Sequence, residues 1–374
     1  MSGDGGSGAA WGHTGYAQRI VFGAGAVRQL PDLLRSIGAR RVLLVTTAGR
    51  LASDDGARVR RALGSDLAST FAEVESRVPA PLALRAVDQA RTDAVDAVVS
   101  FGGGSCADLG KAVCFFTEQQ AGIPSTSWAD RPALPHISIP TTYSGAELTP
   151  FFGMTDPSTR TKSGAGGPTT APIAAVYDPE LTTSTPVRVS AETGMNALAH
   201  CVEVVWSPAR TPEAEAIALA GARRIFAALP LVVDDPGDVS VRAAMLEGAV
   251  LGGRCLQNAS MGVHHGLSQL VGGRTGIAHG LANAVILPHA IRFNADAVPD
   301  AIGRLAEAVG VDDLAAAVAD LVRRVGLPTQ LADCGVTLED VESVARAAPG
   351  NHNVSNNPKP VTADDALGIL TAAY

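Results

Sequence analysis

The distribution of apolar residues changes character about halfway along the chain. Up to about residue 185, short β-branched runs such as residues 41–46 and 97–101 alternate with segments of helical periodicity, and this alternation is typical of a parallel α/β sheet. Beyond Pro186 the segments are alanine-rich and repeat with the period of a helix. We therefore predict an α/β domain over residues 15–185 and an all-helical domain over residues 186–374.

The individual elements follow from the same patterns. In the first half we expect strands at residues 19–23, 41–46, 97–101 and 135–142, and helices at 29–37, 57–63, 83–94 and from about 107. In the second half we expect helices at residues 191–205, 213–229, 240–256, 298–309 and 314–325. Residues 1–14 are predicted to be a flexible tail and residues 164–168 a loop.

Composition narrows the class of protein. The chain has 374 residues, 46% of them hydrophobic and 18% charged, which is typical of a globular protein with a large core. We expect no membrane span and no signal peptide, since no apolar run approaches about 20 residues and the start lacks a basic and apolar leader. The net charge of -8 argues against a nucleic-acid partner. The odd and scattered cysteines are expected to be buried free thiols in the cytoplasm: Cys106, Cys114, Cys201, Cys255 and Cys334.

A glycine-rich turn follows one of the buried strands. Gly102, Gly103, Gly104 and Ser105 stand between that strand and the next helix, where glycine lets a ligand approach the backbone and free N–H groups can bind a phosphate. Asp108 is placed to accept from those N–H groups or to bind a ribose, with Lys111 one helical step further. The turn is neither a Rossmann nor a Walker motif. An ordinary tight turn is the alternative.

Hydroxyl side chains follow the next predicted strand. Residues 140–147 read Pro-Thr-Thr-Tyr-Ser-Gly-Ala-Glu, and ligands of open α/β sheets bind beyond the carboxyl ends of the strands. Helix capping is the alternative role. The earlier strand ends at Thr46 and Thr47, where dinucleotide folds often place an acid; none follows here. Arg50 lies close enough in sequence to meet a 2′-phosphate, or it is a solvated surface residue.

Five of the eight histidines lie between residues 200 and 289. Asn196 and His200 are four residues apart and share a helix face, whereas His265 and His279 can join them only through the fold. Three imidazoles in one pocket would serve a metal or a proton transfer. The alternative is that each histidine is satisfied separately on a helix surface.

Five motifs occur here in the order found in one enzyme family: Gly102-Gly-Gly-Ser with Asp108 and Lys111, Pro140-Thr-Thr with Ser144-Gly-x-Glu, Tyr177-Asp-Pro-Glu-Leu181, Gly194-Met-Asn-Ala-x-x-His200, and His265 with Ala278-His-Gly280. In this the chain resembles the iron-containing (group III) alcohol dehydrogenases. Within them it is most similar to maleylacetate reductases, to which Val21-Phe-Gly-Ala-Gly, His264-His265 and Asn357-Pro-Lys-Pro-Val also point. The resemblance covers about residues 18–374 and implies a dehydroquinate synthase-like fold. We also expect a homodimer.

The resemblance also implies the site residues. Cofactor contacts would come from Thr47, Gly103, Gly104, Ser105, Asp108, Thr141, Thr142, Ser144, Lys162 and Leu181. Metal-dependent members bind their ion through an Asp and three His, which correspond here to Asn196, His200, His265 and His279. Asn is the weaker ligand, and maleylacetate reductases share it and are thought to act without metal. Fe²⁺ or Zn²⁺ is therefore not favoured.

The chain also departs from these relatives. Gln269 stands where the metal-dependent members and the maleylacetate reductases both have a histidine. Gly266 stands where maleylacetate reductases have a lysine. Gly280-Leu-Ala-Asn283 replaces an Ala-Glu-Thr-His-like stretch, and Arg274 is the nearest remaining cation. These differences weaken the case for a dicarboxylate substrate.

The sequence thus predicts a reductase that transfers hydride from NADH or NADPH in the cleft between its domains. Its substrate would be maleylacetate and its product 3-oxoadipate, with His200, His265 or His279 stabilising an oxyanion or delivering a proton. One alternative is a metal-dependent alcohol dehydrogenase or aldehyde reductase acting on a small substrate. The other is the same fold in a non-redox role, such as a lyase or cyclase.

Overall fold

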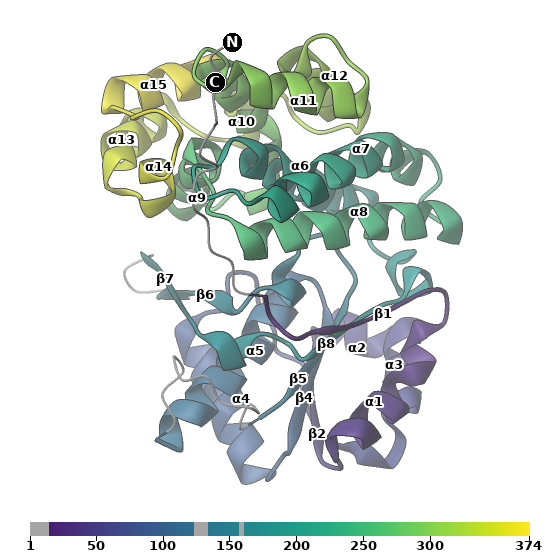
Figure 1. Cartoon of the computed structure of the whole chain (residues 1–374). Helices are drawn as coiled ribbons and strands as arrows, with labels where there is room; N and C mark the ends of the chain where they lie inside the picture. The colour runs from purple at the N-terminus through teal and green to yellow at the C-terminus, as the bar shows by residue number, and fades with distance from the viewer. Residues whose placement is uncertain (1–14, 123–133, 157–160) are drawn as a thin grey trace, which may run out of the picture.

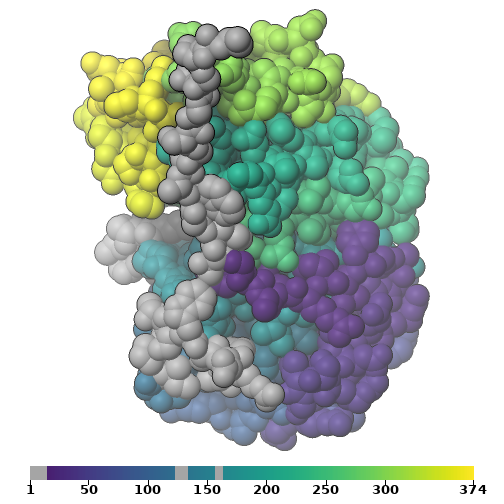
Figure 2. Space-filling view, in the orientation of Figure 1, coloured from purple at the N-terminus to yellow at the C-terminus, as the bar shows by residue number. Residues whose placement is uncertain are grey.

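The computed structural model describes residues 15–122, 134–156 and 161–374. The predicted tail, residues 1–14, lies outside the described residues. Figure 1 shows a sheet-bearing half, built from the first part of the chain, beneath a half made of helices. The two halves meet along a broad seam in Figure 2, where residues near the start of the described chain lie at the surface.

The sheet has six strands, all paired in parallel, in the order β1-β8-β5-β4-β2-β3. The strands are β1 (Arg19–Phe22), β2 (Val42–Val45), β3 (Leu67–Phe71), β4 (Ala97–Gly102), β5 (His136–Pro140) and β8 (Ala174–Tyr177). β3 and β4 flank β2 on opposite sides, so the strand order reverses there. Ligands of open α/β sheets bind at such a switch point, beyond the carboxyl ends of the strands.

Helices cover both faces of the sheet because alternate side chains of each strand point to opposite faces. Leu43 and Val45 of β2 pack in one cluster with α4 (Ala80–Thr92) and α5 (Gly104–Gln120). Val42 and Leu44 pack in another cluster with the helices of the opposite face, α1 (Leu30–Ile37) and α3 (Asp54–Leu63). The predicted strands and helices of this half are confirmed within a few residues. β3 and β8 were not predicted.

A hairpin of β6 (Phe151–Asp156) and β7 (Thr161–Gly166) extends from the sheet-bearing half. The predicted loop at residues 164–168 is therefore wrong for its first three residues, which pair with β6. Glycine suits the end of this strand because the two backbones approach closely. A Cβ on Gly166 would lie 2.7 Å from the Cα of Phe151.

The second half consists of helices, five of which match the predicted segments. They are α6 (Val187–Trp206), α7 (Pro212–Asp234), α8 (Val239–Asn258), α9 (Val263–Thr275), α10 (His279–Asn294), α11 (Pro299–Val309), α12 (Leu314–Arg324), α13 (Leu338–Ala347), α14 (His352–Ser355) and α15 (Ala363–Ala372). By length and composition α7 could cross a membrane, with a mean hydropathy of 1.7 over its most apolar 18 residues. It contributes to the core together with α6 and α8, and 39% of that window is buried inside the structure.

All five cysteines are free thiols. Four are buried as predicted, whereas Cys334 is partly exposed.

Candidate active site

The glycine turn and the hydroxyl segment lie against each other at the carboxyl ends of β4 and β5. Gly102 pairs with Pro140 in the sheet, so the segments that follow β4 and β5 leave the sheet side by side. A Cβ on Gly103 would lie 3.2 Å from Cγ2 of Thr142, and one on Gly104 would lie 3.0 Å from Oγ of Ser144. The two segments expected to lie side by side therefore touch.

Helix α5 begins at Gly104, three residues earlier than predicted. Gly102 has φ 144°, a conformation that favours glycine, and no side chain caps the helix at Gly103. Among the described residues, the buried hydroxyls of Thr141 and Thr142 have no hydrogen-bond partner. Backbone N–H groups at a helix start, with no side chain over them and hydroxyls beside them, fit the pyrophosphate of a dinucleotide.

Asp108 lies one turn inside α5, beyond the N–H groups that it was expected to accept from. Its carboxylate pairs with Nζ of Lys111 at 2.9 Å and accepts a long hydrogen bond from the N–H of Gly153 at 3.5 Å. Lys111 is fully buried and also donates to the carbonyl of Ala146 and the hydroxyl of Thr149. The lysine thus joins α5 to the segment after β5.

Thr47 caps the short helix α2 (Ala48–Ala52) by accepting from the N–H of Arg50. The guanidinium of Arg50 donates to the hydroxyls of Ser184 and Thr185, each at 2.6 Å. The Arg50 side chain is only 16% exposed, so the solvated alternative is wrong, and this burial lowers its pKa. No acid follows Thr47 directly along the chain, but Glu73, after β3, forms a β-bridge with it.

Two further residues expected to contact the cofactor are Leu181 and Lys162. Leu181 is fully buried, in a 3-10 turn at Pro179–Thr182. Lys162 belongs to β7, and its side chain lies outside the described residues.

Three imidazoles converge from three helices, as predicted. His200 lies in α6, His265 in α9, and His279 opens α10. The ring centroids of His200 and His265 are 4.8 Å apart, and those of His265 and His279 are 5.8 Å apart. We refer to these three residues as the histidine cluster.

Burial, followed by the neighbouring His265 and His279, lowers the pKa of His200 well below its usual value. Its ring is therefore neutral at physiological pH.

Sequence reasoning missed the carboxylate behind this cluster. Glu203 lies one helical turn after His200, is fully buried, and accepts from Nδ1 of His265 at 2.5 Å. Its two oxygens also accept from the backbone N–H groups of Gly262, His264 and His265. Burial alone would raise the pKa of Glu203, but the neighbouring imidazoles of His264 and His265 outweigh it, so that pKa is lowered. The spacing from His200 was the available signal.

Asn357 holds the other side of the same helix start. Its Oδ1 accepts from the N–H of Val263 at 3.3 Å and from Nδ2 of Asn294 at 3.0 Å. The Asn-Pro-Lys-Pro-Val segment noted in the sequence therefore anchors the first residue of α9.

A pair of buried amides replaces a carboxylate at the edge of the histidine cluster. Nδ2 of Asn196 faces the carbonyl of Ser144 at 3.4 Å, and Oδ1 of Asn196 accepts from Nδ2 of Asn283 at 2.5 Å. The carbonyl of Ser144 can only accept, which fixes the orientation of both amides. A metal at this position would find three imidazoles and an oxygen already bonded to Asn283, with no charge among the four donors. The imidazoles fit Fe²⁺ or Zn²⁺, but the amide fits poorly.

Glu203, His264 and His265 also have donor atoms close enough to hold an ion. The carboxylate is already hydrogen bonded to the His265 ring and to three N–H groups, and Nε2 of His264 donates to the carbonyl of Asn283 at 2.9 Å. We therefore regard this trio as a hydrogen-bonded support.

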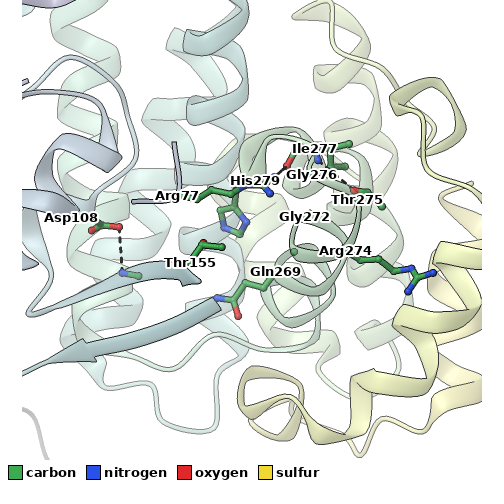
Figure 3. Close-up of a pocket in the computed structure, with 12 residues that line it drawn as sticks. Arg77, Asp108, Thr155, Gln269, Gly272, Arg274, Thr275, Gly276, Ile277 and His279 are labelled. Carbon is green, nitrogen blue, oxygen red and sulfur yellow. Dashed lines mark hydrogen bonds between the residues drawn. The ribbon is translucent and has the colours of Figure 1, made fainter. Parts of the chain in front are cut away.

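A cavity of about 410 Å³ lies between the two halves and reaches His279 (Figure 3). Its lining includes Arg77, Asp108 and Thr155 from the first half, and Gln269 and the turn at residues 272–277 from the second. This volume is within the usual range for small-molecule sites.

The departures noted in the sequence have structural causes here. Gly266 faces α14, where a Cβ would lie 3.0 Å from the backbone nitrogen of Val354, so a lysine does not fit. Gln269 accepts from Nδ2 of Asn353 at 3.0 Å. Arg274 lines the cavity but pairs with Asp340 and Glu339.

Comparison with known proteins agrees with this geometry. Residues 17–179 match the family model of iron-containing alcohol dehydrogenases, and residues 190–374 match the C-terminal model of the Fe-containing alcohol dehydrogenase family. A maleylacetate reductase of Burkholderia cepacia is 36% identical over 356 residues, which is 95% of each chain. The crystal structure of maleylacetate reductase from Rhizobium sp. strain MTP-10005 has a TM-score of 0.87 and 34% identity, and covers 98% of both chains. A sulfoacetaldehyde reductase from Bifidobacterium kashiwanohense, solved with NAD⁺, has a TM-score of 0.89 and 26% identity, with 98% of this chain and 99% of that one covered.

The fold, the glycine turn and the histidine cluster, together with these relatives, identify an NAD(P)-dependent oxidoreductase. The chain belongs to the iron-containing alcohol dehydrogenase family.

Proposed function

We propose that this enzyme reduces maleylacetate to 3-oxoadipate with NADH or NADPH. The observation that carries the proposal is the histidine cluster bordered by Asn196 and Asn283, where metal-dependent relatives have a charged ligand. Support also comes from the full-length similarity to maleylacetate reductases. The oxidoreductase family leaves the non-redox alternative without support.

The glycine turn would hold the cofactor. The N–H groups at the start of α5 bind the pyrophosphate, and Thr141, Thr142 and Ser144 supply hydroxyls around it. When bound, the reduced nicotinamide supplies a hydride. Glu73 forms a β-bridge with Thr47; if Glu73 rejects a 2′-phosphate, the enzyme should prefer NADH over NADPH in steady-state kinetics, and Glu73→Gln should weaken that preference.

The substrate carries an alkene conjugated to a ketone. Hydride adds to the alkene carbon β to the ketone, negative charge collects on the ketone oxygen, and a proton then completes the carbon α to it. The neutral ring of His200 donates an N–H to that oxygen, which is oxyanion stabilisation. Because Glu203 accepts from Nδ1 of His265, Nε2 is the nitrogen of that ring that acts on the substrate. His279, or the His265 ring when it carries a second proton on Nε2, delivers the proton.

A second candidate is a metal-dependent reductase of a small aldehyde or ketone. Gly266 favours it, because no lysine can stand there to bind a carboxylate. In that enzyme the three imidazoles would hold Fe²⁺ or Zn²⁺, which would polarise the carbonyl.

A substrate screen that follows nicotinamide absorbance separates the two candidates. It should use maleylacetate and a series of small aldehydes, with each cofactor, before and after chelation and after addition of Fe²⁺ or Zn²⁺. Turnover of maleylacetate by chelated enzyme supports the proposal. Turnover of aldehydes alone, and only with metal, would refute it.

We further infer a cytoplasmic homodimer that acts on a small molecule and has no nucleic-acid or membrane partner. The net charge of -8 and the free thiols support this inference. Light scattering would measure the oligomeric state.

A further inference from the structure

Arg77 reaches across the cavity from one half of the molecule to the other. It lies in the loop between β3 and α4, and its Nη2 donates to the carbonyl of Ile277 at 2.9 Å, 200 residues further along the chain. A Cβ on Gly276 would lie 4.0 Å from Nη1 of Arg77. The guanidinium therefore lies against the turn that leads into His279, and Figure 3 shows it there.

The surroundings of Arg77 differ from those of the other cations near this cavity. Arg274 pairs with Asp340 and Glu339, and the buried Lys111 pairs with Asp108. In the part of the chain that the structure describes, no carboxylate lies within ion-pair distance of Arg77. The negative charge of Asp108, which also lines the cavity, is offset by Lys111 at 2.9 Å.

The backbone that carries Arg77 is strained. Arg77 and Val78 have φ of 67° and 42°, a region that residues other than glycine rarely adopt and that is most unfavourable for a β-branched residue. The loop is tied to β6, because the N–H of Thr155 donates to the carbonyl of Val78 at 3.1 Å. Such strain is commonly found where a loop presents a side chain to a ligand.

We infer that Arg77 binds a carboxylate of the substrate and so selects a small dicarboxylate over an uncharged ketone. This inference rests on the proposed function. A guanidinium offers two parallel N–H donors to a carboxylate, whereas Arg274, the nearest cation noted in the sequence, is engaged by Asp340 and Glu339. Arg77 and His279 line the same cavity, and Ile277, which accepts from Arg77, is two residues from His279, so a carboxylate on Arg77 lies in the cavity that this histidine reaches. A ketone close to that carboxylate would then reach the histidine cluster.

The test compares kinetics of Arg77→Met and Arg77→Lys with the unaltered enzyme. For Arg77→Met, KM for maleylacetate should rise about 10- to 100-fold, the range for losing a charged hydrogen bond, with kcat changed less than about threefold, since a carboxylate remote from the reacting carbon binds equally in ground and transition states. Arg77→Lys should retain part of the affinity. Arg91→Met is the matched control, because Arg91 pairs with Asp88 on the exposed face of α4, and it should leave KM unchanged.

Two results would overturn the assignment: an unchanged KM in Arg77→Met, or a larger rise in Arg274→Met. Thermal unfolding of each variant checks the fold.

Calorimetry with maleate keeps this test separate from the proposed function. If the unaltered enzyme does not reduce maleylacetate, the proposed function fails, and Arg77 is then judged by maleate binding alone. Affinity at least tenfold weaker in Arg77→Met supports the inference. Equal affinity in both proteins, or no maleate binding to the unaltered enzyme, refutes it.

Discussion

Replacing Glu203 by glutamine tests whether the buried carboxylate supports the histidine cluster. Oε1 of Glu203 accepts from the N–H groups of Gly262 and His264, and Oε2 accepts from the N–H and Nδ1 of His265. Glutamine keeps one oxygen and replaces the other by an NH₂ group, which can only donate. Whichever way the amide turns, two buried donors lose their acceptor.

The magnitude follows from that count. Each buried donor left without a partner costs about 1–3 kcal/mol, so Glu203→Gln should lower the free energy of unfolding by about 2–6 kcal/mol. If the amide faces Nδ1 of His265, that ring must turn or change tautomer. Loss of such a supporting carboxylate typically costs about 10- to 100-fold in activity, and we expect kcat/KM to fall by that factor.

Urea unfolding and steady-state kinetics at pH 7 measure the two effects. Glu247→Gln is the control, because Glu247 and its partner Arg224 are both about half exposed, and such pairs contribute about 1 kcal/mol or less. The reasoning is refuted if Glu203→Gln unfolds at the same urea concentration as the unaltered protein and retains its kcat/KM.

Three further predictions concern other parts of the molecule. Gly104→Val should weaken dinucleotide binding at least tenfold in calorimetry, because its side chain would stand over the helix N-terminus and against Ser144; equal affinity would remove the turn from the site. Chelation should leave maleylacetate turnover intact, and elemental analysis should show Asn196→Asp retaining more zinc than the unaltered protein, since a carboxylate adds charge to the donor set; stoichiometric metal whose removal abolishes turnover would contradict this. Burial, with a smaller contribution from the charge of Lys111, lowers the pKa of His136 to about 3, whereas in the unfolded chain it is about 6.5. The unfolded state therefore binds a proton first as pH falls, and stability should decrease between pH 6.5 and 3 by up to about 1.4 kcal/mol per unit; an identical slope in His136→Asn would contradict the assignment.

Much of the fold could be predicted because its elements have strong patterns. β2 and β4 are buried on both faces and read as continuous apolar runs, and α11 and α12 each bury one side. α9 and α10 were not predicted from periodicity. Both are buried on most sides, α9 contains several glycines, and α10 has Pro288 in its interior, so neither shows an apolar stripe.

The site could be predicted where chemistry is concentrated in short motifs. The histidine cluster and the contact between the glycine turn and the hydroxyl segment were both expected. Arg77 and Asn283 could not be found this way, because each is recognised only by a contact with a residue far along the chain. Arg77 donates to Ile277, and Asn283 donates to Asn196. Pairing over such distances is a property of the fold and leaves no local pattern.

The anchoring of α9 by Asn357 has a consequence for folding during translation. The N–H of Val263 receives its acceptor from a side chain 94 residues further along the chain. Translation adds about 5–20 residues per second, so about 5–20 seconds pass between the synthesis of Val263 and that of Asn357. The sheet is already synthesised by then, so the glycine turn is complete before α9 and its histidines are anchored beside it.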